Sequence, residues 1–113
     1  MNVLKYETNQ WVEVRLGVFR RIVHLEHLMT VMFEFRNGPW SEAEPFHSHT
    51  HEQTCYIAKG EIMLHCEGEQ DQHLTEGDLF YIPSGKNHTI QVLSVMARLV
   101  DSFSPIREDF LEL

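Results

Sequence analysis

Histidine is concentrated in one short stretch of the sequence, FHSHTHEQ at residues 46–53, which carries His47, His49 and His51. Another histidine, His88, ends a second stretch that is rich in turn residues, PSGKNH. Neutral imidazole is the commonest metal ligand in proteins, and a metal site needs three or four donors that converge. These side chains could therefore hold a divalent metal. The plainer alternative is that they are solvated histidines on a strand edge.

The sequence predicts that short β-strands carry these residues. Apolar and polar residues alternate with a period of two in eight stretches, and breakers such as Gly and Pro separate them, so the sequence predicts an all-β sandwich or barrel. The stretches are 11–16, 19–25, 28–35, 54–60, 61–66, 79–83, 88–95 and 96–103. We expect a short helical turn only over PIREDFL, residues 105–111, because Pro suits the first turn of a helix.

The register of one hairpin can also be predicted. Gly60-Glu61 fits a two-residue loop, which would place Cys55 opposite Cys66. A disulfide there is geometrically conceivable. The two cysteines match no metal motif, however, and the cytoplasm keeps thiols reduced, so we expect free thiols, with the disulfide as the alternative.

Strand geometry sorts the possible ligands by face. Successive side chains point to opposite faces, so His47, His49 and Gln53 share one face and Glu52 lies on the other. The amide oxygen of Gln53 could complete a set of donors. His88 begins a later predicted strand and shares one face of it with Ile90 and Val92. A histidine is unusual on such an apolar face.

At these residues the sequence resembles the cupins, a family of small β-barrels with two motifs, G-x5-H-x-H-x3,4-E-x6-G and G-x5-P-x-G-x2-H-x3-N. The motifs are matched over 47–60 and 77–88 by His47, His49, Gln53, Gly60, Gly77, Pro83, Gly85 and His88. The resemblance implies one cupin domain over residues 1–113, with an RmlC-like double-stranded β-helix, or jelly-roll barrel, and a metal on His47, His49, Gln53 and His88.

Three positions depart from the motifs. Ser41 and Val92 replace the first Gly and the last Asn, and Gln53 replaces the usual Glu. A neutral donor at Gln53 would leave the full charge of the metal available to a substrate. Glu52 would break both the motif spacing and the strand parity, so we favour Gln53. His51 has the right parity but no motif position, and we place it at the rim or beside the ligands.

A carboxylate near the carboxyl terminus is a further candidate. This carboxylate is Asp101, and strand parity places it on one face with Val95, Ala97, Leu99 and Phe103. An acid on the interior side of a strand is a functional candidate. The alternative is a weak salt bridge at the rim between Asp101 and Arg107, which would fasten the tail.

With this tail, the sequence is similar to the small KdgF-type cupins of pectin and alginate breakdown, which convert 4,5-unsaturated monouronates to linear keto forms. The resemblance implies that Asp101 and Arg107 are catalytic and that Phe103 and Arg107 bind a small anionic sugar acid. It also implies one divalent transition metal, which could be Ni, Fe, Mn, Co or Zn. The alternatives are a quercetinase-like cupin dioxygenase and a non-enzymatic sugar-binding cupin.

Charge and hydropathy exclude other classes of partner. Nine basic and seventeen acidic side chains give a formal net charge of −8, which opposes binding to nucleic acid. No run of 18 uncharged apolar residues is present, so we expect no membrane partner and a cytoplasmic protein. Small cupins commonly dimerise, and we expect a homodimer.

Overall fold

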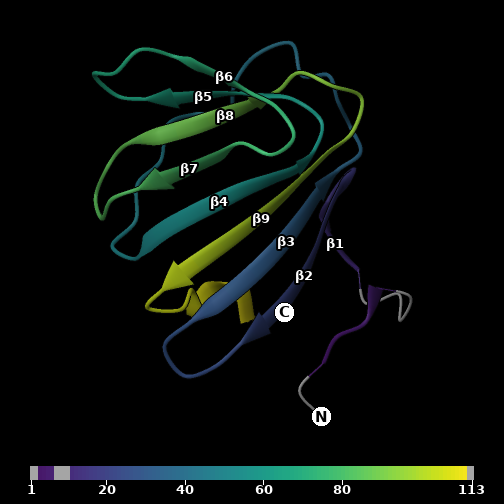
Figure 1. Ribbon diagram of the computed structural model, residues 1–113, viewed down its shortest axis with the longest axis vertical. Coiled ribbons are helices and arrows are strands. Elements are labelled where there is room, and N and C mark those ends of the chain that lie inside the picture. The colour runs from purple at the N-terminus through teal and green to yellow at the C-terminus, as the bar shows by residue number, and fades with distance from the viewer. Residues whose placement is uncertain (1–2, 7–10, 112–113) are drawn as a thin grey trace.

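The computed structural model describes residues 3–6 and 11–111, which form two antiparallel sheets (Figure 1). The larger has six strands in the order β1-β2-β3-β9-β4-β7, and the smaller has three in the order β6-β5-β8. The strands are β1 Val12–Arg15, β2 Val18–His24, β3 Met29–Phe35, β4 Glu52–Lys59, β5 Ile62–Cys66, β6 Gln72–Leu74, β7 Leu79–Ile82, β8 His88–Val92 and β9 Ala97–Ser104. The all-β prediction is confirmed, and each of the eight predicted stretches overlaps one strand, although β2, β4 and β9 extend one or two residues beyond their stretches.

Two local predictions need correction. The short strand β6 was not predicted, because Gln72-His73-Leu74 is mostly polar and is held by pairing with β5. The helical turn is shorter than 105–111: a 3-10 helix, η2, covers Glu108–Leu111. In the described part of the chain no helix is long and apolar enough to cross a membrane.

The predicted hairpin at Gly60-Glu61 is wrong. Strands β4 and β5 belong to different sheets, so Cys55 lies opposite Asp101 and Cys66 lies opposite His88, and both thiols are free. Gly60 is where the chain passes from one sheet to the other. Its φ of 84° is left-handed, and a Cβ there would lie 2.4 Å from the carbonyl oxygen of Met96. A glycine that permits this crossover looks like a hairpin glycine in the sequence.

The core lies between the inner faces of the two sheets. Its apolar side chains come from both sheets and are Val18, Phe35, Cys55, Ile57, Ile62, Leu64, Phe80, Ile82, Val92, Ala97 and Leu99. Along β9 the alternation predicted from the sequence holds from Ala97 to Phe103, whereas Val95 precedes the strand and is exposed. The same alternation carries Asp101 into the interior, opposite the core residue Cys55.

Candidate metal centre

Three imidazoles converge at one end of the space between the sheets. The ligand nitrogens of His47, His49 and His88 all lie within 4.8 Å of one another. His88 begins β8, and the backbones of His47 and His88 exchange two hydrogen bonds of 3.0 and 2.9 Å. Apart from this bridge, His47 and His49 lie in the segment before β4 rather than in a strand. The segment and β8, 40 residues apart in the chain, thus form the cluster together.

Gln53 adds an oxygen to this cluster. Its side chain points inward from β4, and its Oε1 lies 3.1 Å from Nε2 of His49. Glu52 is exposed on the other face of the same strand. The inner set is therefore three imidazole nitrogens and one amide oxygen, all neutral donors.

Hydrogen bonds fix which imidazole nitrogen can act as a ligand. Nδ1 of His49 lies 3.0 Å from the carbonyl oxygen of His51, and Nδ1 of His88 lies 2.8 Å from that of Lys86. A carbonyl only accepts, so these Nδ1 atoms carry the proton and Nε2 keeps its lone pair. Burial lowers the pKa of His47 and of His88, which keeps both rings neutral. The residues therefore fit a divalent transition metal.

His51 lies behind the cluster. Its ring stacks on that of His49, with centroids 3.8 Å apart, and meets the edge of Phe103 at 4.9 Å. Burial, and secondarily the neighbouring His49, lowers the pKa of His51 to about 4. The Nε2 of this neutral ring has no hydrogen-bond partner among the described residues. His51 thus supports the ring of His49 and is not one of the three converging ligands.

A cavity of about 270 Å³ opens beside the cluster. Six of the residues that line it were singled out from the sequence: His47, Gln53, His88, Asp101, Phe103 and Arg107. Pockets for drug-sized ligands span roughly 300–1,000 Å³. The cavity is thus of a size that accepts a small molecule.

Asp101 is the buried acid of this cavity. It is 6% exposed, on β9 between Val31 and Cys55 of the neighbouring strands. Burial raises its pKa to about 6, although hydrogen bonds from Cys55 and Gln53 act in the opposite direction. Its Oδ1 has no hydrogen-bond partner among the described residues. This buried oxygen is thus left without a hydrogen-bond donor from the described part of the protein.

Arg107 does not form the alternative salt bridge to Asp101. Its Nη2 lies 2.9 Å from Oδ2 of Asp109 instead, and its guanidinium lies over the rings of Phe110 and Phe103, at 3.9 and 5.6 Å. Arg107 therefore lines the cavity as a cation stacked on two aromatic rings, next to η2.

Arg20 and Phe110 are among the cavity residues that were missed from the sequence. The alternation in FRRIVHL was a usable signal for the first, because it places Arg20 on the same face as Ile22. Phe110 had no such signal, since its position depends on how η2 folds back over β3 and β9. Figure 1 shows η2 beside these strands, and Phe110 contacts Phe33 and Phe103 there.

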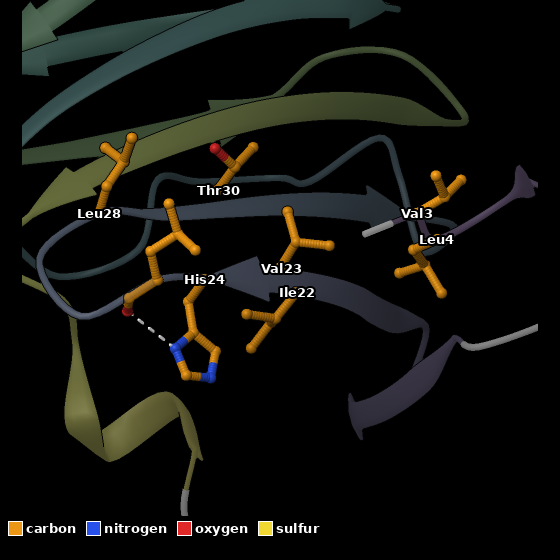
Figure 2. Close-up of a pocket in the computed structure, with 8 residues that line it drawn as sticks. Val3, Leu4, Ile22, Val23, His24, Leu28 and Thr30 are labelled. Carbon is orange, nitrogen blue, oxygen red and sulfur yellow. Dashed lines mark hydrogen bonds between the residues drawn. The ribbon is translucent and has the colours of Figure 1, made fainter. Parts of the chain in front are cut away.

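A larger hollow, of about 650 Å³, lies elsewhere and offers no comparable chemistry. Figure 2 shows its aliphatic lining, including Val3, Leu4 and Leu28, around the ends of β2 and β3. Its one imidazole, His24, has Nδ1 3.1 Å from the carbonyl oxygen of Leu25. No cluster of metal ligands is found there in the described part of the chain.

Comparison with known proteins agrees with this architecture. Residues 34–103 match the family described as Cupin domain. The pectin degradation protein KdgF of Dickeya dadantii (strain 3937) is 32% identical over 102 residues, which cover 89% of this chain and 90% of that protein.

Two solved structures are similar over nearly the whole chain. KdgF from Halomonas sp. has a TM-score of 0.83 and 30% identity, and the match covers 94% of this chain and 96% of that one. An RmlC-like cupin from Shewanella frigidimarina NCIMB 400 has a TM-score of 0.85 and 30% identity, with 97% and 96% covered. The fold and the resemblance predicted from the two motifs are confirmed.

Proposed function

The chain belongs to the cupin family, and on that premise we propose that it is a metal-dependent enzyme that converts 4,5-unsaturated monouronates to their linear keto forms. The observation that carries the proposal is that three members of the cluster, His47, Gln53 and His88, line the same cavity as a buried carboxylate, Asp101. Similarity to a pectin degradation protein supports a sugar acid as the substrate class.

His47, His49, Gln53 and His88 would hold the metal. When bound, a divalent cation supplies positive charge that stabilises the negative charge that develops on an enolate oxygen. Because all four donors are neutral, none of that charge is cancelled by the protein ligands. Nickel, iron, manganese, cobalt and zinc all accept such a set.

Asp101 would move the proton. The substrate is a cyclic hemiacetal with a C4=C5 double bond. Asp101 accepts the proton of the C1 hydroxyl, the C1–O5 bond breaks, C1 becomes an aldehyde and O5 becomes an enolate oxygen on C5. Return of a proton to C4 gives the C5 ketone, so the reaction is an isomerisation with no net gain or loss of atoms or electrons. A pKa of about 6 suits a general base near neutral pH.

Incubation with an unsaturated monouronate tests the proposal. The conjugated enol absorbs in the ultraviolet, and we expect enzyme-dependent loss of this absorbance without oxygen consumption. Oxygen uptake with a phenol or diketone would instead support a cupin dioxygenase. Binding of the sugar acid without any turnover would support a non-enzymatic sugar-binding cupin.

Substitution of Gln53 by Glu tests the role of ligand charge. Gln53→Glu should keep the metal, because a carboxylate oxygen is at least as good a donor, but it should raise KM for the anionic substrate by about 10-fold, since one positive charge is cancelled. Glu52→Gln is the matched control, because it changes one charge on the outer face of β4 and should leave KM unchanged. A lower KM in Gln53→Glu would contradict this electrostatic explanation.

Substitution of Arg107 by Lys tests recognition of the carboxylate. Lysine keeps the charge but loses the planar pair of donors and the stacking on Phe110, so Arg107→Lys should raise KM by about 10-fold with a smaller effect on kcat. Steady-state kinetics would measure both constants. Arg36→Lys is the control, because Arg36 lies on the outer face over Phe19, and it should leave both constants unchanged. If Arg107→Lys and the control had the same kcat and KM, Arg107 would not be a substrate-binding residue.

Two parts of the proposal concern the setting of the enzyme. We propose that it acts as a homodimer in the cytoplasm. Sedimentation of the purified protein and fractionation of its host cell would test these two predictions.

A further inference from the structure

We infer that Arg20 is a further substrate-binding residue, and that its guanidinium and that of Arg107, which both lie against Phe110, together receive the carboxylate of a monouronate. The inference deepens the proposed function and rests on it for the substrate class. It assigns the recognition of the acid group to β2 as well as to the carboxyl-terminal segment.

Strand geometry places Arg20 inside the fold. On β2 it pairs with Phe33, and its side chain shares the inner face with Val18 and Ile22. The residue lines the same cavity as His47, Asp101 and Arg107. An interior strand position is normally apolar, so a cation there calls for an anionic partner.

The contacts of Arg20 hold it without neutralising it. Its Nη2 donates to the carbonyl oxygen of Phe110 at 2.9 Å, and its Cζ lies 4.6 Å from the centroid of the Phe110 ring. A guanidinium has five N–H donors, and this carbonyl uses one. Within residues 3–6 and 11–111 no carboxylate lies within ion-pair distance of Arg20.

The other arginines of the cavity differ in this respect. Arg15 pairs with Glu44, and Arg107 pairs with Asp109. Among the described residues Arg20 is therefore the cavity arginine without a carboxylate partner, whereas Asp109 offsets part of the charge of Arg107. Burial lowers its pKa, and Asp109 and Arg107 act on it in opposite directions. A guanidinium nevertheless stays protonated, so Arg20 presents a full charge.

The two guanidiniums can act on one group. Both lie against Phe110, Arg20 at 4.6 Å and Arg107 at 3.9 Å from the ring centroid. Because the chain as a whole is acidic, with a net charge of −8, a local pair of cations is what makes this cavity favourable for an anion. A sugar acid whose carboxylate lies at the arginines can place its ring toward Asp101 and the imidazoles.

Binding of a stable sugar acid tests the inference separately from the reaction. We would measure, by NMR titration, the Kd of D-galacturonate and of its uncharged methyl ester for the protein before and after loading with metal. Arg20→Gln should weaken D-galacturonate by about 10- to 100-fold, the value of a charge-assisted hydrogen bond, and leave the ester within about 2-fold. Arg36→Gln is the matched control and should change neither by more than about 2-fold, because Arg36 lies outside the cavity, over Phe19.

The alternatives give different results. If Arg20 only held Phe110 in place, Arg20→Gln would lower Tm and weaken acid and ester equally, and this result would overturn the inference. An unchanged Kd for D-galacturonate, or a wild-type protein that binds acid and ester equally well, would overturn it too. Arg20→Lys, which keeps the charge and a donor for the Phe110 carbonyl, should recover part of the acid selectivity.

Failure of the reaction and failure of the inference remain distinguishable. If the wild-type protein selects acid over ester through Arg20 but never consumes an unsaturated monouronate, the binding role stands and the proposed reaction fails. If the wild-type protein consumes the monouronate and Arg20→Gln does so with the same KM, the reaction stands and the role of Arg20 fails.

Discussion

Asp101→Asn is expected to lower the turnover of an unsaturated monouronate by about 10²- to 10⁴-fold, the usual contribution of a positioned acid or base. The amide cannot accept the hemiacetal proton. Asp101 is buried, its Oδ1 lacks a protein partner among the described residues, and burial raises its pKa toward the working range of a base. The loss should appear in kcat, with little change in KM.

The same variant should keep its fold and its metal, since amide and carboxylate are nearly isosteric and Asp101 is outside the converging ligand group. Measurements of Tm and metal content beside turnover separate the cases. Asp71→Asn is the matched control, because Asp71 is exposed and pairs with His65. Its turnover, Tm and metal content should equal those of the wild type. If Asp101→Asn lost its metal or turned over normally, Asp101 would be a structural residue.

Much of the fold could be predicted because strand alternation is a local signal. The inner face of β9, from Ala97 to Phe103, was read directly from a period of two, and this alone placed Asp101 and Phe103 inside. The wrong hairpin shows the limit of local signals. Whether β4 and β5 pair depends on which sheet each strand joins, and Gly60 permits either a turn or a crossover.

The site was predictable to the extent that its residues lie close in sequence. His47, His49 and Gln53 are neighbours along the chain, and their spacing was enough to group them. Their meeting with His88 depends on a backbone bridge across 40 intervening residues; His88 could be named as a candidate from its residue type, but local alternation does not predict the bridge. Arg20 enters the cavity only because β2 and β3 extend the sheet beyond β9.

Removal of one imidazole should have a similarly large effect on the metal. His88→Ala is expected to weaken metal binding by more than about 100-fold, because even the loss of a group that merely supports a ligand costs up to that factor. His88 is 3% exposed, and its Nδ1 contact with the carbonyl of Lys86 fixes the tautomer that offers Nε2 to a metal. Turnover should be lost with the metal.

His51→Ala is the control that separates ligation from packing. Both substitutions remove a buried imidazole that contacts the ring of His49 or His47, and both leave the backbone bridge of His88 in place. Of the two residues, only His88 contributes a nitrogen to the converging group. His51→Ala should therefore weaken metal binding by no more than about 10-fold, which is the smallest loss expected when a group that supports a ligand is removed. Competition with a chromogenic chelator would give both affinities, and the rise in Tm on adding metal should persist only in His51→Ala. If the two variants lost metal equally, the cluster would depend on packed rings rather than on three ligand nitrogens, and the assignment of His88 as a ligand would be wrong.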